Sequence, residues 1–330
     1  MSMFEENEVS KNAFGGTELA KRKLAAILDP SLLNDFQVVC SRPRDLDESK
    51  IRIFFANDLA TDPESAKFRD ESFRDKFHKF VFISNWQMSQ YQLVHGIPYD
   101  TKSIVLESGI DIAPETVKSK DKIRLVYTST PQRGLDILVP VFKHLAEKYP
   151  DIHLDVFSSF KIYGWDDADK QFEPLYDEIR NHPQMTYHGF VPNETLRSTL
   201  NDCHIFAYPS TWVETSCRAM LEAMTAGLVC VHPNLGALPD TSGSLNVMYQ
   251  GSMDKNEHAN IFNAHLEAAI NFVKNDAHVS MVQFNKTYID SRFGIDRIKR
   301  QWETMLKDLL NRYPTEESRS FPKQQFVYRT

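Results

Sequence analysis

The chain has no apolar run long enough to cross a bilayer, and residues 1–14 lack the apolar core of a secretory signal. Cysteine is scarce, and the four thiols show no metal-ligand spacing: Cys40, Cys203, Cys217 and Cys230. The net charge of −7 comes without any block of like charges, which argues against nucleic acid as the main partner. These absences predict a cytoplasmic protein with reduced thiols and no transmembrane segment.

At 330 residues the chain is long enough for two domains, and its 42% apolar content is typical of a soluble globular protein. Short apolar strands alternate with helical stretches, which predicts an α/β fold with parallel sheets covered on both faces. Strands are predicted at residues 36–40, 51–56, 80–83 and 104–106, and again at 123–127, 152–157, 185–188, 204–208 and 228–232. A helix with a charged face is predicted at residues 64–77, and a helix with one apolar stripe at residues 295–312.

The most informative stretch is YPSTWVETSCRAMLEAMTAG, residues 208–227. An apolar strand enters a Pro-Ser turn, Glu214 follows, and a helical stretch that contains Glu222 ends at Gly227, a residue type suited to a helix C-terminus. Two carboxylates are therefore expected on one strand–turn–helix unit, with Glu214 at the mouth of the helix and Glu222 about two turns deeper.

The first turn of that helix is predicted to hold Thr215 and Ser216, where free backbone N–H groups and the helix dipole favour an anion. In open α/β folds, ligands bind beyond the carboxyl ends of strands, and this turn is expected to lie there. A phosphorylated polyol fits such a site, because its phosphates face the amides and the carboxylates bind its hydroxyls.

This stretch resembles the retaining glycosyltransferases of family four, whose signature is two glutamates with seven residues between them, set between "PS" and "EAM-x-x-G". Glu214 and Glu222 match that pair, and Pro209, Met224 and Gly227 match its frame. The resemblance implies the GT-B fold, in which two Rossmann-like domains face a central cleft and a C-terminal helix crosses back to the N-terminal domain.

The resemblance also implies roles for this stretch. Glu222 is expected to bind the ribose hydroxyls of a nucleotide-sugar donor. Glu214 is expected to bind the sugar ring, with the backbone N–H groups of Thr215, Ser216 and Cys217 beside it. The alternative is a surface helix with two solvated carboxylates.

A second matching turn follows the strand at residues 123–127. Family members carry two basic residues there that hold the diphosphate, and Arg133 matches the second of them. Ser129 stands at the position of the first. Arg133 is therefore expected to clamp the diphosphate with its fork of donors, and Gly134 permits close approach. The alternative is an ordinary surface arginine.

Three weaker matches complete the resemblance. Gly189 and Val191 belong to a "G-x-V" turn, whose backbone meets the nucleotide base in the family. Gly15 and Gly16 precede a helix and are expected to face the donor phosphates and the acceptor. Asn57 stands where relatives often carry a histidine near the transferred sugar. The strand that usually opens the family's N-terminal domain is not evident in residues 1–13.

An Asp-x-Asp pair lies in a polar segment, where Asp167 and Asp169 follow Asp166. Such a pair can hold a divalent metal, as it does in other glycosyltransferases, or can be an ordinary polar loop. We favour the loop, because no apolar strand flanks the pair, and we expect neither a metal nor another cofactor.

The expected organisation is an acceptor-side domain at residues 1–115, a nucleotide-sugar-binding domain at 116–294, a crossover helix at 295–313 and a mobile polar tail at 314–330. Residues 114–122 form the expected linker, because they are charged and poor in strand-forming residues.

The expected activity is transfer of a sugar, with retention of configuration, from a UDP- or GDP-sugar rather than an ADP-sugar. The acceptor is the hydroxyl of a glycan, a lipid-linked or a small molecule. A nucleotide-sugar epimerase or hydrolase, and a non-catalytic nucleotide-sugar-binding protein, remain alternatives. The expected location is cytoplasmic, with peripheral attachment to a membrane as an option.

Overall fold

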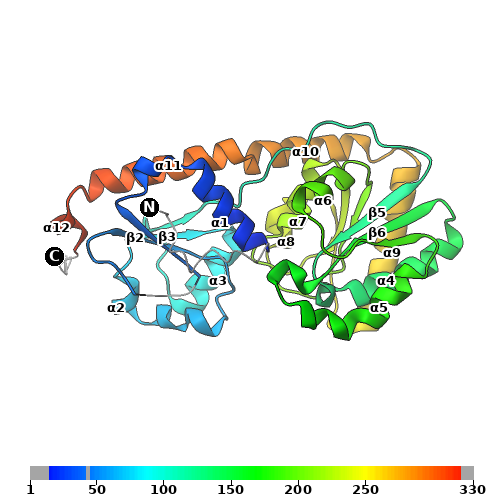
Figure 1. Ribbon diagram of the computed structural model, residues 1–330, viewed down its shortest axis with the longest axis horizontal. Coiled ribbons are helices and arrows are strands. Elements are labelled where there is room, and N and C mark those ends of the chain that lie inside the picture. Colours follow the sequence, from blue (N-terminus) through cyan, green and yellow to red (C-terminus); the bar gives the residue numbers. More distant parts are fainter. Residues whose placement is uncertain (1–14, 42–44, 321–330) are drawn as a thin grey trace, which may run out of the picture. The chain divides into compact units, whose positions relative to one another are not determined.

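The computed structural model describes residues 15–41 and 45–320 (Figure 1). The chain divides into two compact units. The first contains Thr17–Glu107 and the residues from Ile298 on, and the second contains Ser108–Arg297. The expectation of no strand in residues 1–13 lies outside the described residues. Within the described ranges, no helix combines the length and the apolar character that crossing a membrane requires.

The first unit is built on a parallel sheet whose described strands follow the chain order: β1 (Phe36–Cys40), β2 (Ile51–Phe55), β3 (Lys79–Phe82) and β4 (Ser103–Val105). All residues of β2 are buried, as expected for an inner strand of a sheet covered on both faces. The predicted strands of this half are confirmed to within one residue at each end.

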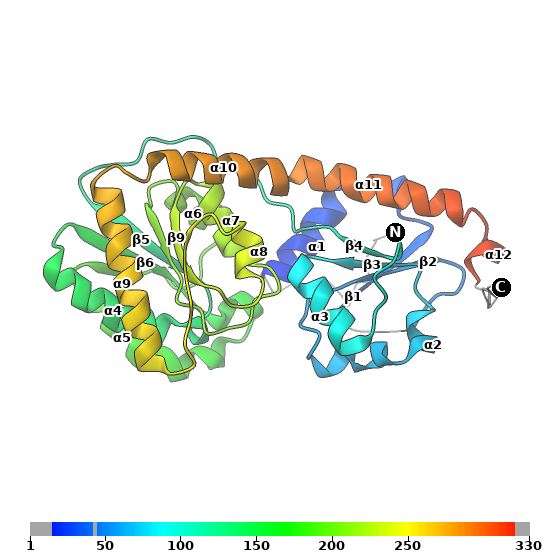
Figure 2. The same ribbon diagram turned by 180° about the vertical axis from the view of Figure 1, so that it is seen from behind.

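Helices cover both faces of this sheet (Figures 1 and 2). One apolar layer joins α1 (Gly16–Ile27) and α11 (Ile295–Arg312) to the sheet, and Phe55 meets Trp302 there with ring centroids 5.2 Å apart. On the other face, Phe54 packs among aromatic side chains from the segment between β2 and β3 and from α3 (Asn85–His95). Adjacent residues of β2 thus serve opposite layers.

The single helix predicted at residues 64–77 is wrong in detail. The segment forms a short 3-10 helix, Pro63–Arg69, and then α2, Glu71–Arg74. Asp70 interrupts it in an extended conformation, and its carboxylate accepts a hydrogen bond from the backbone N–H of Ser72. An aspartate that caps the next helix in this way cannot also continue the previous one.

The C-terminal helix crosses back, as the resemblance implied. α11 begins at Ile295, in the second unit, and its residues from Ile298 on belong to the first. The chain beyond Pro314 was expected to be a mobile tail, but its described part forms α12, Glu316–Arg319. Arg319 is buried in the first unit and forms an ion pair with Asp35 at 2.8 Å, which fixes this segment.

The second unit holds a larger parallel sheet in the order β10-β9-β8-β5-β6-β7. Its strands are β5 (Ile123–Thr128), β6 (Ile152–Phe157), β7 (Met185–Tyr187), β8 (Ile205–Ala207), β9 (Val229–Pro233) and β10 (Val247–Tyr249). The chain builds outward from β5 to β7 and then returns to the other side of β5 with β8. The order therefore reverses between β5 and β8, the position where open α/β sheets bind ligands. The edge strand β10 was not predicted.

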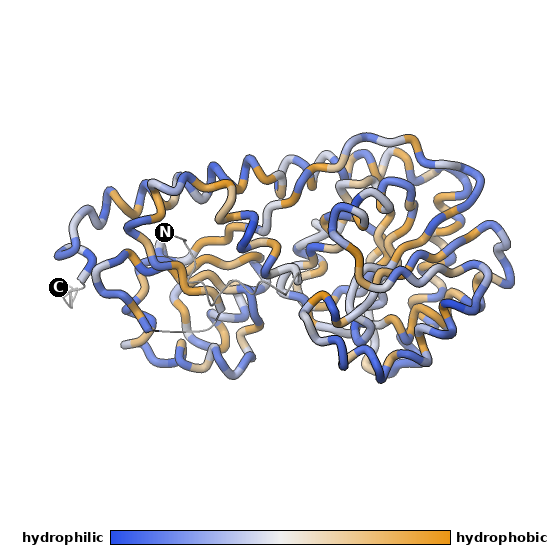
Figure 3. Tube along the Cα trace, viewed as in Figure 1, coloured by the Kyte–Doolittle hydropathy of each residue, from blue (hydrophilic) through white to orange (hydrophobic). Residues whose placement is uncertain are grey.

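Two groups of helices cover this sheet. On one face lie α4 (Leu135–Lys148), α5 (Glu173–Arg180) and α9 (Lys255–Lys274), and on the other lie α6 (Asn193–Leu200), α7 (Arg218–Thr225) and α10 (Val279–Phe293) (Figures 1 and 2). Figure 3 shows the strands as the most apolar part of the unit and the outer helices as largely polar. This is the α/β architecture predicted from the alternation of strands and helices.

The predicted linker, residues 114–122, lies within the second unit, where hydrogen bonds hold both the linker and the residue before it, Ala113. The backbone N–H of Ala113 donates to Oγ1 of Thr225 at 3.0 Å, and Nζ of Lys286 donates to the carbonyl of Ala113 at 2.6 Å. Further along, Nζ of Lys118 donates to the carbonyl of Ala226, just after α7, at 2.9 Å. The segment is thereby tied to α7 and α10.

Candidate functional site

The reversal point of the second sheet brings together two residues that the sequence singled out separately. Arg133 lies in a 3-10 turn after β5, and Glu214 lies in the loop after β8. Nη1 of Arg133 donates to Oε1 of Glu214 at 2.7 Å. The two carboxyl-terminal loops are therefore joined by an ion pair, and its side chains are only 20% and 7% exposed.

Aromatic side chains surround this ion pair. The hydroxyl of Tyr208 donates to the same carboxylate oxygen of Glu214 at 2.6 Å. Nη2 of Arg133 donates to the hydroxyl of Tyr163 at 3.4 Å, and the guanidinium lies 5.4 Å from the ring centroid of Trp212. The result is a charged pair inside a partly exposed aromatic frame.

The pKa values agree with this charge distribution. Burial opposes the charge of Arg133, but the adjacent carboxylate of Glu214 outweighs it and raises the pKa of the guanidinium. Burial, and then the charge of Glu214, raises the pKa of Tyr208 well above its ordinary value. The phenol therefore remains protonated and donates to Glu214, while Arg133 remains a permanent cation.

Several polar atoms near this edge of the sheet are buried and have no hydrogen-bond partner among the described residues. They are Nε of Arg133, Oγ1 of Thr128, Oγ1 of Thr130 and Oγ of Ser158. Three of these residues follow or end β5, and the fourth follows β6. Buried polar groups in folded proteins are nearly always satisfied, so these four atoms are expected to bind water or a bound polar molecule.

Two glycines allow the loops to approach so closely. Gly134 has φ of 103°, and a Cβ there would lie 2.1 Å from the carbonyl oxygen of Pro209. Gly236 has φ of 57°, and a Cβ there would lie 2.6 Å from the carbonyl oxygen of Glu214. The backbone N–H of Ala237 donates to that same oxygen at 2.8 Å. The backbone of Glu214 is thus fixed by a neighbouring loop.

The residues after Glu214 differ from their predicted place. α7 begins at Arg218, so Thr215 and Ser216 precede the helix and are half-buried, outside its first turn. Cys217 is the N-cap residue, and its backbone N–H donates to Oγ1 of Thr241 at 3.4 Å. The prediction failed because the chain bends at Thr215 and is extended at Cys217, while the backbone of Glu214 packs beside Gly236. Burial raises the pKa of the Cys217 thiol, which argues against a nucleophilic role.

Glu222 lies inside α7, as predicted, and Gly227 follows the helix with φ of 73°. One oxygen of the carboxylate, Oε1, accepts hydrogen bonds from Nδ2 of Asn193 at 3.3 Å and from Nε of Arg218 at 3.1 Å. Asn193 is the first residue of α6, after the N-cap residue Pro192, and its side chain binds Glu222 rather than capping the helix.

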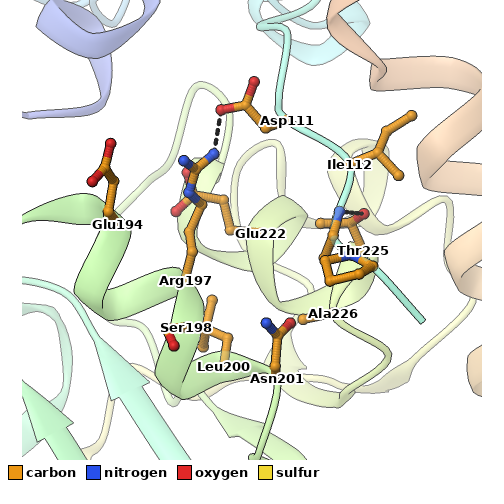
Figure 4. Close-up of a pocket in the computed structure, with 12 residues that line it drawn as sticks. Asp111, Ile112, Glu194, Arg197, Ser198, Leu200, Asn201, Glu222, Thr225 and Ala226 are labelled. Carbon is orange, nitrogen blue, oxygen red and sulfur yellow. Dashed lines mark hydrogen bonds and ion pairs between the residues drawn. The ribbon is translucent and has the colours of Figure 1, made fainter. Parts of the chain in front are cut away.

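Glu222 also lines a pocket with a volume of about 270 Å³. The wall is formed by α6, by α7 and by the start of the linker, and Asp111 forms an ion pair there with Arg197 (Figure 4). Glu194 of α6 is a further acidic group on the wall. The pocket therefore presents carboxylates and a guanidinium, a set that suits hydroxyl groups.

The remaining predicted residues of the second unit lie at the same edge of its sheet. Ser129 follows β5, and its hydroxyl is 3.5 Å from the hydroxyl of Tyr208, which binds Glu214. Gly189 follows β7 with φ of 64°, and Val191 is half-buried against the core. Val191 stands two residues before Asn193, so this turn leads directly to the group that binds Glu222.

The other predicted positions lie at the beginning of the described chain and in the first unit. Gly15 is buried in a bend, and Gly16 begins α1. Asn57 is buried just beyond β2, where its Nδ2 donates to the carbonyl of Phe55 at 3.1 Å and its backbone N–H donates to Oγ of Ser41 at 3.2 Å. A role in binding for these three residues stays a prediction.

The acidic segment after β6 is organised by its own hydrogen bonds. Asp169 is buried and accepts from Oγ of Ser159 at 2.5 Å, from the backbone N–H of Phe160 and from the hydroxyl of Tyr176. Asp167 is exposed and pairs with Lys170. Across residues 15–41 and 45–320, no cluster of three or more potential metal ligands occurs.

Sequence reasoning missed five participants: Tyr163, Tyr208, Trp212, Asn193 and Arg218. Tyr208 and Trp212 stand within the motif itself, so their nearness to Glu214 in sequence was an available signal. Asn193 and Tyr163 reach the site only through the order of the strands, which no local pattern reveals. Arg218 carried a signal that was overlooked, because a cation is unfavourable at a helix N-terminus.

The sequence of this chain is similar to those of known proteins. Residues 111–278 match the sequence profile of the family described as "Glycosyl transferases group 1". A curated relative is a component of the human phosphatidylinositol N-acetylglucosaminyltransferase, which is 27% identical over 132 residues, or 39% of this chain. The match spans 26% of that protein, so the chain corresponds to about a quarter of its length.

Two solved structures are similar in fold. The glycosyltransferase from Rickettsia africae superposes with a TM-score of 0.68 at 14% identity, over 91% of this chain and 83% of that one. Anabaena Alr3699/HepE in complex with UDP-glucose superposes with a TM-score of 0.58 at 16% identity, over 78% and 72% of the two chains. These similarities confirm the predicted GT-B fold. Because the family match spans half of the sequence, the chain belongs to the glycosyl transferases group 1 family.

Proposed function

We propose that this protein is a retaining glycosyltransferase of family four that moves a sugar from a nucleotide-sugar donor to an acceptor hydroxyl. The observation that carries the proposal is the Arg133–Glu214 ion pair at the reversal point of the second sheet, with Glu222 on the same strand–turn–helix unit. A permanent cation and two carboxylates at this position suit a diphosphate joined to two polyols, which is the chemistry of a nucleotide-sugar.

Each residue then has a distinct part. Arg133 binds the diphosphate, and Gly134 lets the diphosphate approach the turn. Glu214 binds hydroxyls of the transferred sugar, and Tyr208 holds that carboxylate in place. Glu222 binds the ribose hydroxyls. The buried polar atoms without partners beside β5 support this arrangement, because phosphate oxygens would satisfy donors such as Nε of Arg133.

The proposed reaction needs no protein nucleophile. The bond between the anomeric carbon and the diphosphate breaks, and the acceptor oxygen forms its bond to that carbon on the same face. The acceptor proton passes to the departing phosphate oxygen, so configuration is retained and charge is balanced. The contribution of the protein is to position the donor and to stabilise negative charge on the diphosphate, which Arg133 does directly.

The donor is proposed to be a UDP-sugar carrying glucose or N-acetylglucosamine. The support is the UDP-glucose bound to Anabaena Alr3699/HepE and the transferase name of the human relative. The acceptor is proposed to be a glycan or lipid-linked hydroxyl, with no metal required. A cytoplasmic location is supported by the four cysteines, which are all buried in the structure and show no pattern of extracellular disulfide pairing.

The test is a two-stage assay of the whole chain. Melting temperature is measured with UDP-glucose, UDP-N-acetylglucosamine, GDP-mannose and ADP-glucose, since a ligand at about 100 times its Kd stabilises by roughly 2.7 kcal/mol. The donor that binds is then incubated with mixed glycan and lipid acceptors, and the anomeric configuration of the product is read by NMR. We expect a UDP-sugar to raise the melting temperature and to yield the retained product.

Three outcomes would contradict the proposal. An inverted product would exclude retention. Donor loss at the same rate with and without acceptors would identify a hydrolase or epimerase. Tight donor binding with no turnover under any condition would identify a binding protein. Glu222→Gln is the matched control for the binding stage, because it removes one proposed donor contact and keeps the shape of the side chain.

A further inference from the structure

The carboxylate of Glu222 is held on one side only. Both of its hydrogen bonds, from Asn193 and from Arg218, end on Oε1. Oε2 receives no hydrogen bond from the described residues, although the carboxylate as a whole is only 5% exposed and lines the pocket. A buried carboxylate with one oxygen bound and one oxygen available has a defined direction in which it can accept further donors.

Arg218 orients the carboxylate of Glu222, but an arginine at this position is unfavourable for the stability of α7. It is the first residue of α7, where the helix dipole disfavours a cation by a few tenths of a kcal/mol or more. Its pairing with Glu222 four residues later has the basic residue first, the less favourable order for a helical pair. A residue that breaks two rules of helix stability indicates a role outside the helix itself.

The guanidinium of Arg218 is shared between two partners. Nε donates to Glu222, and Nη1 donates to the carbonyl of Gly109 at 3.0 Å. Gly109 is itself fixed, because the adjacent Ile110 exchanges backbone hydrogen bonds with Phe293 and Ile295. Arg218 is only 11% exposed. Its guanidinium is therefore fixed by the carbonyl of Gly109 on one side and binds the carboxylate of Glu222 on the other. A lysine has no such fork and cannot reproduce both contacts in one plane.

We propose that Arg218 is a positioning residue that holds the Glu222 carboxylate in the orientation in which Oε2 accepts the ribose hydroxyls of the donor. The inference rests on the proposed function, since it assigns Arg218 to the donor site through Glu222.

Other charged groups lie near Glu222, and their effects on UDP binding must be distinguished from the effect of Arg218. From α6 come Glu194 and Arg197, and from the segment just before the linker comes Asp111, which pairs with Arg197. From α10 come Lys286 and Asp290, which pair with each other at 2.8 Å. None of these groups donates a described hydrogen bond to Glu222, so Arg218 is the cation with a direct hold on it.

The test is a double-mutant cycle on binding of UDP, measured by isothermal titration calorimetry with the full chain. We expect Arg218→Met to weaken UDP binding about tenfold and Glu222→Ala about tenfold or more, as for loss of a charge-assisted contact. If Arg218 acts through Glu222, the double variant should match Glu222→Ala within about twofold. Independent effects would instead multiply to about a hundredfold, and that result would overturn the proposal.

A further readout separates positioning from a merely structural role. Arg218→Lys restores the charge beside Glu222, so UDP binding should recover to within about threefold of wild type, and the remaining loss reflects the missing fork. UDP binding in Arg218→Lys that is as weak as in Arg218→Met would contradict the proposal.

Controls keep the outcomes distinct. Arg180→Met removes an exposed arginine of α5 in the same unit and should leave UDP binding within about twofold of wild type. Melting temperatures establish that each variant is folded, and Arg218→Lys carries the test if Arg218→Met is not. Wild type that binds no UDP, GDP or ADP would overturn the proposed function and this inference with it. Wild type that binds UDP while the cycle is additive would overturn only the inference.

Discussion

Nη1 of Arg133 and Oε1 of Glu214 are 2.7 Å apart, so two side chains expected to bind different parts of a donor are bonded to each other. A guanidinium has five N–H donors, and Glu214 and Tyr163 accept from one each, so a diphosphate can share Arg133 with Glu214. Arg133 would then contact both ends of the donor: the diphosphate directly, and the transferred sugar through Glu214.

The first prediction concerns Arg133 itself. Arg133→Ala should lower kcat/KM about ten- to a hundredfold, since a hydrogen bond to a charged group contributes roughly 1.5–3 kcal/mol. It also leaves Glu214 buried beside Tyr208 without its cation, so a lower melting temperature is expected. Steady-state kinetics and thermal melts measure both effects, with Arg180→Ala on α5 as the control. A normal rate in folded Arg133→Ala would show that another group holds the phosphates.

The second prediction uses the position where the family carries another basic residue. The hydroxyl of Ser129 lies 3.5 Å from that of Tyr208, close to the ion pair, so a cation placed here would face the same diphosphate. Ser129→Arg should tighten donor binding by several-fold, by adding one charge-assisted contact. The comparison is Ser129→Met, which adds similar bulk without charge. Weaker binding in both variants would mean that the space beside Tyr208 is occupied by the donor itself.

The third prediction concerns the turn that carries Arg133. Gly134→Ala combines a positive φ with a Cβ that would meet the carbonyl oxygen of Pro209 at 2.1 Å, so it should destabilise by about 3 kcal/mol. Gly227→Ala is the control, because φ there is 73° and the nearest described atom to its Cβ is 3.9 Å away; about 1 kcal/mol is expected. Chemical denaturation measures both. Equal losses would show that the two loops separate without cost.

Sequence periodicity located most strands because burial on both faces makes them rich in apolar residues, as at Phe36–Cys40 and Ile152–Phe157. The strand β10 was missed because it is three residues long and only Tyr249 in it is buried.

The motif residues were found, but their neighbours were not. Glu214 and Glu222 lie in a recognisable frame within 20 residues of chain, whereas Arg133 meets Glu214 only because β8 returns to the side of β5. Thr215 and Ser216 were placed in the helix on local propensity. Packing of the Glu214 backbone against Gly236, a residue far along the chain, keeps them outside it. Strand order decides these contacts, and it is not encoded in any short window.

The fourth prediction concerns acid stability. His204 is buried between the linker and β5: its Nδ1 accepts from the backbone N–H of Arg124 at 3.1 Å, and its Nε2 donates to the carbonyl of Ser119 at 2.9 Å. Burial lowers the pKa of His204 to about 4, and burial likewise lowers the pKa of His232 to about 4. Below a pH of about 6.5 these two histidines bind protons in the unfolded chain but not in the folded chain.

Stability should therefore be complete above pH 6.5 and decline as pH falls toward 4, by up to about 3 kcal/mol for each of these histidines. Urea denaturation at several pH values measures the slope. His204→Asn keeps an acceptor for Arg124 but cannot titrate, so its stability should fall less steeply with acid than that of wild type. If stability fell equally steeply with pH in wild type and in His204→Asn, the His204 side chain would be protonated or exposed to solvent in the folded protein.

The fifth prediction separates the two glutamates by the part of the reaction that each one serves. Glu222 is proposed to touch ribose, which does not change during transfer, so its contact is equally good in the ground state and the transition state. Glu222→Gln should therefore raise KM for the donor and leave kcat within a few-fold. Glu214 is proposed to touch the ring that acquires oxocarbenium character, so Glu214→Gln should lower kcat more than it raises KM, by roughly 2–4 kcal/mol of transition-state stabilisation.

The contacts of the two carboxylates make this comparison sharp. Each accepts from an arginine in the present structure, Glu214 from Arg133 and Glu222 from Arg218, so Gln removes one charge from one buried pair in both cases. Differences in folding should therefore be similar, and melting temperatures check that they are. What differs is position: Glu214 shares its arginine with the diphosphate, and Glu222 does not. A loss of kcat in Glu222→Gln with only a KM change in Glu214→Gln would reverse the assignment, and wild-type kinetics in both would make the motif structural.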